Sequence, residues 1–214
     1  IWGLVTMIYG GAMALMQDDI KRLLAYSSIS QMGYILFGIG SMSVLGLSGA
    51  EMMYVTHALG KGILFMMAGI IIVKVGTRNI SQLGGLAGKM PITAVCAVIG
   101  ALTIMGVPPT SGFMGEWTLF AGALQTAIHD GSTVRAVTFG LGLVATVLTM
   151  SYILWMLKRV FFGKLPQNLE NVKEGSWYMT APMMVLAGFT IVLGIYPDIF
   201  FKTIIPYMNG VLGV

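Results

Sequence analysis

The sequence has very few charged residues. Only 9% of its 214 residues are Asp, Glu, Lys or Arg, whereas 57% are hydrophobic. Soluble globular domains carry about 25% charged residues. The composition therefore excludes a soluble globular domain and indicates an integral membrane protein.

Cysteine and histidine are also scarce. The chain has one Cys and two His, which excludes an internal disulfide and leaves too few ligands for a zinc site. We expect Cys96, which lies inside an apolar run, to be a buried packing residue. The sequence contains no glycine-rich phosphate loop and no Ser-His-Asp arrangement. We therefore expect no catalytic residue, no metal, no cofactor and no redox centre in this chain, and no nucleic-acid partner.

Long apolar runs separated by short polar segments make up most of the sequence. A helix needs about 20 apolar residues to cross a bilayer, and runs near this length predict an all-α membrane protein rather than barrel strands. We expect about six transmembrane helices, at residues 1–16, 25–47, 51–73, 91–128, 134–162 and 177–196. The tail, residues 197–214, suits either a surface helix or part of another span. Because the chain opens inside an apolar run, we expect it to be part of a longer polypeptide.

The basic residues are distributed unevenly among the loops. Loops on the cytoplasmic side of a membrane are enriched in Lys and Arg. The first, third and fifth loops, which lie on one side of the membrane, carry nine basic residues: Lys21, Arg22, Lys74, Arg78, Lys89, Lys158, Arg159, Lys164 and Lys173. The segments on the other side carry only Arg135 and Lys202. The first, third and fifth loops are therefore predicted to face the cytoplasm of a prokaryotic cell.

One expected span, residues 91–128, is too long for a single helix and is predicted to contain a break. Pro108 and Pro109 have no backbone N–H, so carbonyl groups one turn earlier lose their helical partners. Gly106 and Gly112 flank the prolines and relax the backbone. A broken helix is stable at membrane depth only if it is buried in protein or lines a wet cavity.

Three titratable side chains fall within the expected spans. Lys61 is near the middle of the third span, His57 precedes it by four residues, and Glu116 follows the break. Residues four apart project from one side of a helix, and ionisable residues at membrane depth are usually functional. We interpret Lys61, His57 and Glu116 as a proton relay in which Glu116 faces Lys61 across a hydrated interior.

Each of these residues also has a structural interpretation. Lys61 could form a static ion pair, His57 could make an interhelical hydrogen bond, and Glu116 could pair with a base of a neighbouring subunit. Tyr26, Ser27 and Ser30 could line a hydrophilic path, although such residues usually form hydrogen bonds between helices. We interpret Glu51 as a solvated charge at the N-terminus of its helix, and the acidic and basic residues at 18–22 as a solvated turn or a subunit contact.

Three stretches together resemble a known family. They read QDDIKRLLAYSSISQMGYIL (17–36), THALGKGILF (56–65) and GVPPTSGFMGEW (106–117). The sequence resembles the antiporter-like membrane subunits of respiratory complex I, of the NADH-quinone oxidoreductase chain 4 or chain M type. Related subunits occur in membrane-bound hydrogenases, deazaflavin-dependent dehydrogenases and Mrp-type sodium/proton antiporters.

The resemblance implies a fold of fourteen helices with two inverted five-helix repeats, each containing a broken helix. This chain, residues 1–214, would be a proton-conducting transporter domain comprising the second repeat and the last helix. Glu116 matches the titratable residue of the second broken helix, which is implied to lie at the exit of the proton path. The expected partners are other membrane subunits, protons or sodium ions, and the lipid bilayer.

Three functions remain open on the sequence. The first is a proton-translocating, non-redox subunit of a complex I-like pump driven by electron transfer elsewhere. The second is an Mrp-type sodium/proton antiporter subunit. The third is a membrane scaffold that only positions other subunits.

Overall fold

The computed structural model describes residues 1–213 and is helical throughout. Within that range there are eight α-helices, three short 3-10 turns and no strand. The helices are α1 (Trp2–Leu15), α2 (Ile20–Ile39), α3 (Val44–Val75), α4 (Pro91–Ile104), α5 (Ser111–His129), α6 (Thr133–Phe161), α7 (Trp177–Ile195) and α8 (Asp198–Leu212).

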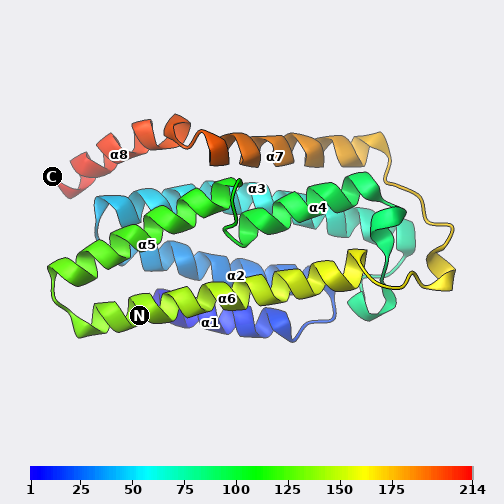
Figure 1. The fold of residues 1–214 in the computed structure, drawn as a ribbon, viewed down its shortest axis with the longest axis horizontal. Coiled ribbons are helices and arrows are strands. Elements are labelled where there is room, and N and C mark those ends of the chain that lie inside the picture. Colours follow the sequence, from blue (N-terminus) through cyan, green and yellow to red (C-terminus); the bar gives the residue numbers. More distant parts are fainter. Residues whose placement is uncertain (214) are drawn as a thin grey trace.

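The helices α1 to α7 run along the long axis of the molecule, and α4 and α5 follow each other end to end (Figure 1). The loops at 16–19, 76–90 and 162–176 gather at one end, and the turns at 40–43 and 130–132 lie at the other. This alternation agrees with the arrangement expected from the basic residues. By length and hydropathy, α3, α6 and α7 are each able to cross a membrane, and α1 and α4 are shorter apolar helices.

Two helices begin earlier than the sequence predicts. The second was expected at 25–47, but α2 begins at Ile20 because Asp19 accepts hydrogen bonds from the Lys21 and Arg22 amides. The third was expected at 51–73, but α3 begins at Val44, where the Ser43 hydroxyl accepts from an amide of the first turn. Side-chain caps satisfy amides that have no partner within the helix, so α2 begins in polar sequence. Residues 44–47, expected at the end of the second span, belong to α3 instead, because α2 ends at Ile39.

The interpretation of Glu51 as an N-terminal charge is wrong for the same reason. Because α3 begins at Val44, no acidic residue lies in its first turn, and Glu51 is an exposed side chain two turns into the helix. The effect of the helix dipole falls off within the first turn. The dipole therefore gives no account of this carboxylate.

Ion pairs connect the loops at the end of the bundle that contains the basic residues. The Asp19 carboxylate lies 2.7 Å from Arg78 Nε, and the Asp18 carboxylate lies 2.7 Å from Arg159 Nη1. One backbone hydrogen bond also joins Asp18 to Ile80, and another joins Ile20 to Arg78. These acids therefore compensate the charges of the loop after α3 and of the end of α6, while the Asp18 and Arg78 side chains remain mostly exposed to solvent, in agreement with the solvated turn.

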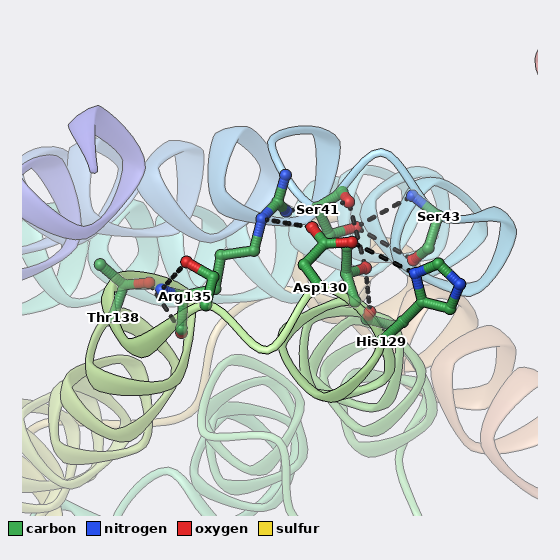
Figure 2. Close-up of polar contacts among 9 residues, drawn as sticks. Ser41, Ser43, His129, Asp130, Arg135 and Thr138 are labelled. Carbon is green, nitrogen blue, oxygen red and sulfur yellow. Dashed lines mark hydrogen bonds and ion pairs between the residues drawn. The ribbon is translucent and has the colours of Figure 1, made fainter.

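A second polar cluster lies at the opposite end of the helix bundle (Figure 2). Arg135, in the first turn of α6, lies 3.0 Å from the Asp130 carboxylate and donates to the Ser41 carbonyl. The same carbonyl accepts from Thr126 of α5. The cluster joins the turn between α2 and α3 to the turn between α5 and α6.

The tail forms an amphipathic helix after Pro197. In α8, Phe201 and Met208 are buried, whereas Ile199, Tyr207 and Val211 are exposed. The helix contacts α3 and continues beyond the end of α7 (Figure 1).

Candidate ion pathway

The long fourth apolar segment is interrupted at the predicted prolines. Helix α4 ends at Ile104 and α5 begins at Ser111, with Pro108 and Pro109 between them. Gly106 has a φ of +64°, a conformation that costs other residues about 1–2 kcal/mol. Gly112 is not in the interruption but in the first turn of α5, where a Cβ would collide with the Thr103 carbonyl.

Side chains of α2 and of the loop itself donate hydrogen bonds to carbonyl groups at the interruption. The Ile104 carbonyl, which has no helical partner, accepts a hydrogen bond of 3.2 Å from Gln31 Nε2 of α2. Within the loop, the Thr110 hydroxyl donates to the Val107 carbonyl at 2.7 Å. Gln31 and Thr110 are both buried. They therefore take the place of water as hydrogen-bond donors to backbone carbonyls that lack a helical partner.

Glu116 lies in the second turn of α5 with its carboxylate against Gly106. A Cβ built on Gly106 would overlap the Glu116 carboxylate, so the glycine both permits the turn and leaves room for the acid. Within the part of the chain that the structure describes, this carboxylate forms no ion pair. It lines a groove of about 400 Å³ between α5 and α6 whose other walls are mainly apolar, including Phe113, Trp117 and Phe139.

Lys61 is buried in the middle of α3, with 5% of its surface exposed. Its ammonium group donates to the Leu24 carbonyl at 3.0 Å and to the Ser27 hydroxyl, both on α2. Neither acceptor is an anion, and Lys61 forms no ion pair with any acid in residues 1–213. The static ion pair weighed for Lys61 is therefore absent from this part of the protein.

Lys61 and Glu116 do not contact each other. The amine is directed at the first half of α2, and the carboxylate lies at the loop after α4. The second half of α2 lies against α5, as the edge-on packing of the Tyr34 ring against Phe120 shows. Phe120 is one helical turn after Glu116 on α5. Lys61 therefore contacts α2 at Ser27. About two turns further along α2, Tyr34 contacts α5, the helix that carries Glu116.

A stripe of polar residues follows α2 between these two points. Ser27, Ser30, Gln31 and Tyr34 are all buried and recur at the spacing of one helical face. The Tyr34 hydroxyl lies 3.1 Å from that of Thr149 on α6. The hydroxyl of Tyr152, also on α6, is buried without a hydrogen-bond partner in the described residues. A buried polar atom without a partner indicates an internal hydration site.

The other predicted residues take different positions. Ser30 donates to the Met7 carbonyl of α1 at 2.8 Å and thereby joins two helices. Tyr26 is half-buried and packs beside the main apolar core. His57 is half-buried, and its Nδ1 has no hydrogen-bond partner within residues 1–213. The interhelical hydrogen bond considered for His57 is therefore not formed by this nitrogen.

Sequence reasoning missed several members of the pathway. Gln31, Tyr34, Thr149 and Tyr152 were not among the residues predicted to line a hydrophilic path. The helical spacing of Gln31 and Tyr34 from Ser27 was the available signal. No group of three His, Cys, Asp or Glu in residues 1–213 is arranged to hold a metal ion.

The fold and the site define a class of helical membrane protein in which an interrupted helix lies beside a buried lysine and an interior polar stripe. The chain belongs to the family described as NADH:quinone oxidoreductase/Mrp antiporter, transmembrane, whose family model matches residues 1–138.

Relatives in this family are similar over most of this chain. NAD(P)H-quinone oxidoreductase chain 4 1 of Synechococcus elongatus is 37% identical over 203 residues, which is 93% of this chain and 37% of that protein. A Na(+)/H(+) antiporter subunit of Alkalihalophilus pseudofirmus is 35% identical over 233 residues, 99% of this chain and 29% of that protein. The chain thus spans 37% and 29% of the lengths of these two relatives.

A solved structure shares the fold. A chain of respiratory complex I from Thermus thermophilus matches with a TM-score of 0.88 and 24% identity, covering 99% of this chain and 43% of that one. At this identity the match shows the fold alone.

Proposed function

We propose that this chain is a portion of a proton-translocating membrane subunit of a complex I-like, redox-driven pump in a prokaryotic cell membrane. Residues 1–214 would form a proton-conducting domain with six spans: α1, α2, α3, the interrupted pair α4–α5, α6 and α7. This unit would be the second inverted repeat and the last helix of a fourteen-helix subunit. The other membrane subunits of the complex would be its partners, and the redox chemistry would take place elsewhere in the complex.

The observation that carries the proposal is a pair of uncompensated charges, the buried amine of Lys61 and the half-buried carboxylate of Glu116. Lys61 has two neutral acceptors and no anion, and Glu116 has no cation within the described residues. A buried charge without a partner is costly, so its proton occupancy responds to nearby charge. A charge displaced elsewhere in the complex would therefore change whether Lys61 and Glu116 hold a proton.

The polar stripe on α2 supplies a route between the two groups. Hydroxyl groups both accept and donate protons through hydrogen bonds. Ser27 contacts Lys61, and Tyr34 lies near Glu116 and Thr149. With water at the Tyr152 hydroxyl, these side chains would relay a proton from Lys61 toward Glu116, and His57 would tune or accept it.

The test uses the full-length subunit in its intact complex. Glu116→Gln and Lys61→Ala should each depress proton translocation while assembly and electron transfer persist. Matched controls are Glu51→Gln and Lys74→Ala, which alter exposed residues of α3. Normal translocation in both test variants would overturn the relay. A loss of assembly in both, with normal flux in whatever complex forms, would instead favour the scaffold function.

An Mrp-type sodium/proton antiporter subunit is the second candidate. It is favoured by the family, which includes Mrp antiporters, and by the 35% identity to the Na(+)/H(+) antiporter protein of Alkalihalophilus pseudofirmus. Proton flux in vesicles, measured with and without sodium and with and without an electron donor, separates the two. Flux that needs the donor and ignores sodium supports the pump, and flux that needs only a sodium gradient supports the antiporter.

A further inference from the structure

One hydroxyl of α7 contacts both halves of the interrupted helix. Thr190 Oγ1 lies 3.0 Å from Thr103 Oγ1, near the end of α4, and 2.6 Å from Ser111 Oγ, the first residue of α5. All three side chains are buried, with at most 3% of their surface exposed. The two half-helices are thus bridged through a third helix.

The protons in this bridge have a defined direction. Thr103 donates its hydroxyl proton to the Ile99 carbonyl at 2.8 Å. A hydroxyl has only one proton, so Thr103 must accept from Thr190, and Thr190 must accept from Ser111. The result is a chain that runs from Ser111 through Thr190 and Thr103 to the backbone of α4, and bonds in such chains strengthen one another.

The backbone of α7 also lies directly against the interruption. Gly194 is one helical turn after Thr190, and a Cβ built on it would collide with the Pro109 carbonyl and the backbone of Thr110 and Ser111. Only a glycine permits this approach. Two contacts one turn apart on α7 therefore fix the start of α5.

The start of α5 determines where Glu116 lies. Glu116 follows Ser111 by five residues, on the same short helix, and its carboxylate rests against Gly106 on the α4 side of the interruption. A change in the angle between α4 and α5 would move the carboxylate relative to Gly106. The contacts that hold this angle thus hold the acid.

We propose that Thr190 is a positioning residue for Glu116: its hydroxyl bridges Thr103 and Ser111 and so sets the place of the carboxylate in the ion pathway. This inference rests on the proposed function for its consequence in transport. The position of the carboxylate itself can be measured independently of transport.

The test compares three variants of the full-length subunit in its complex. Thr190→Val removes the hydroxyl with little change of shape, and Thr190→Ser keeps it. Thr180→Val is the matched control, since Thr180 is also buried on α7 but its hydroxyl contacts only the backbone of its own helix and the residue that precedes it. The first measurement is the rate at which a hydrophobic carbodiimide labels Glu116, followed by mass spectrometry. The second is the pH profile of proton translocation.

Thr190→Val removes both hydrogen bonds of the bridge, so it should change the labelling rate about 5- to 30-fold, the factor that about 1–2 kcal/mol contributes to an equilibrium, and should shift the pH profile. Thr190→Ser and Thr180→Val should match the unmodified protein in both. Wild-type labelling in Thr190→Val, or an equal change in Thr180→Val, would overturn the proposal. If Thr190→Val does not assemble, Ser111→Ala is used instead, because it removes only the donor to Thr190. It should change the labelling rate and the pH profile in the same way, and wild-type labelling in it would overturn the proposal.

Failure of the proposed function gives a different pattern. If Glu116→Gln translocates protons normally but Thr190→Val still alters labelling, the positioning role stands and the relay through Glu116 fails. If Glu116→Gln stops translocation but Thr190→Val changes neither measurement, the positioning role fails and the relay stands.

Discussion

Replacing Gly106 with alanine should damage the candidate pathway for two separable reasons. The backbone at this position has a φ of +64°, which costs a residue with a Cβ about 1–2 kcal/mol. The new Cβ would also overlap the Glu116 carboxylate. The carboxylate is the end of a flexible side chain beside a groove, so moving it out of its rotamer costs about 0.5–1.5 kcal/mol more. We therefore expect Gly106→Ala to destabilise the full-length subunit by about 1.5–3.5 kcal/mol in total and to reduce proton translocation.

Gly131 provides a matched control. It has a similar φ of +57°, in the turn between α5 and α6, but a Cβ there would meet no atom within 4 Å. Gly131→Ala should therefore cost only the conformational part, about 1–2 kcal/mol, and should leave translocation unchanged. The free energy of unfolding is measured by denaturant titration in mixed micelles.

A double variant isolates the contribution of the acid. In a Glu116→Ala background the space beside Gly106 is empty, so Gly106→Ala should then cost no more than Gly131→Ala. If Gly106→Ala is as mild as Gly131→Ala in the native background, the carboxylate does not lie against this glycine, and the geometry argued for Glu116 is wrong.

Three further substitutions test other contacts, each through the free energy of unfolding of the full-length subunit. Gln31→Leu leaves a buried carbonyl at the end of α4 unsatisfied and should cost about 1–3 kcal/mol, whereas exposed Gln125→Leu should cost almost nothing. Glu174→Ala removes an acceptor that holds two amides and a hydroxyl at the start of α4 and should cost about 2–3 kcal/mol, with exposed Glu170→Ala as its control. Asp19→Ala removes the N-terminal cap of α2 and should cost about 1–2 kcal/mol. Nearly all of this comes from the lost cap, because the ion pair with exposed Arg78 contributes little. A cost below about 0.5 kcal/mol in any of the three would contradict the corresponding contact.

The interruption of the fourth span was predictable because proline acts locally. Pro108 and Pro109 lack the N–H groups that a continuous helix requires, whatever surrounds them. The positions of the basic loops were predictable for a similar reason, since charge distribution and hydropathy are properties of the sequence alone. The ends of α2 and α3 were missed because hydropathy was given more weight than the capping residues Asp19 and Ser43.

The connections within the site depend on tertiary structure and were not predictable. Gln31 and Ile104 are 73 residues apart, and Thr190 and Ser111 are 79 apart. No local pattern indicates that such residues meet. The separate surroundings of Lys61 and Glu116 also depend on how α3 packs against both α2 and α5, which no short stretch of the sequence encodes.

The most direct test of the account is whether Glu116 changes its protonation state during turnover. Infrared difference spectroscopy of the intact, energised complex reports the carbonyl stretch of protonated carboxyl groups. We expect a band that appears or disappears on energisation and is absent from Glu116→Gln but retained in Glu51→Gln. A spectrum in which Glu116→Gln shows the same bands as the native complex would mean that this acid carries no proton through the cycle, and would contradict the account.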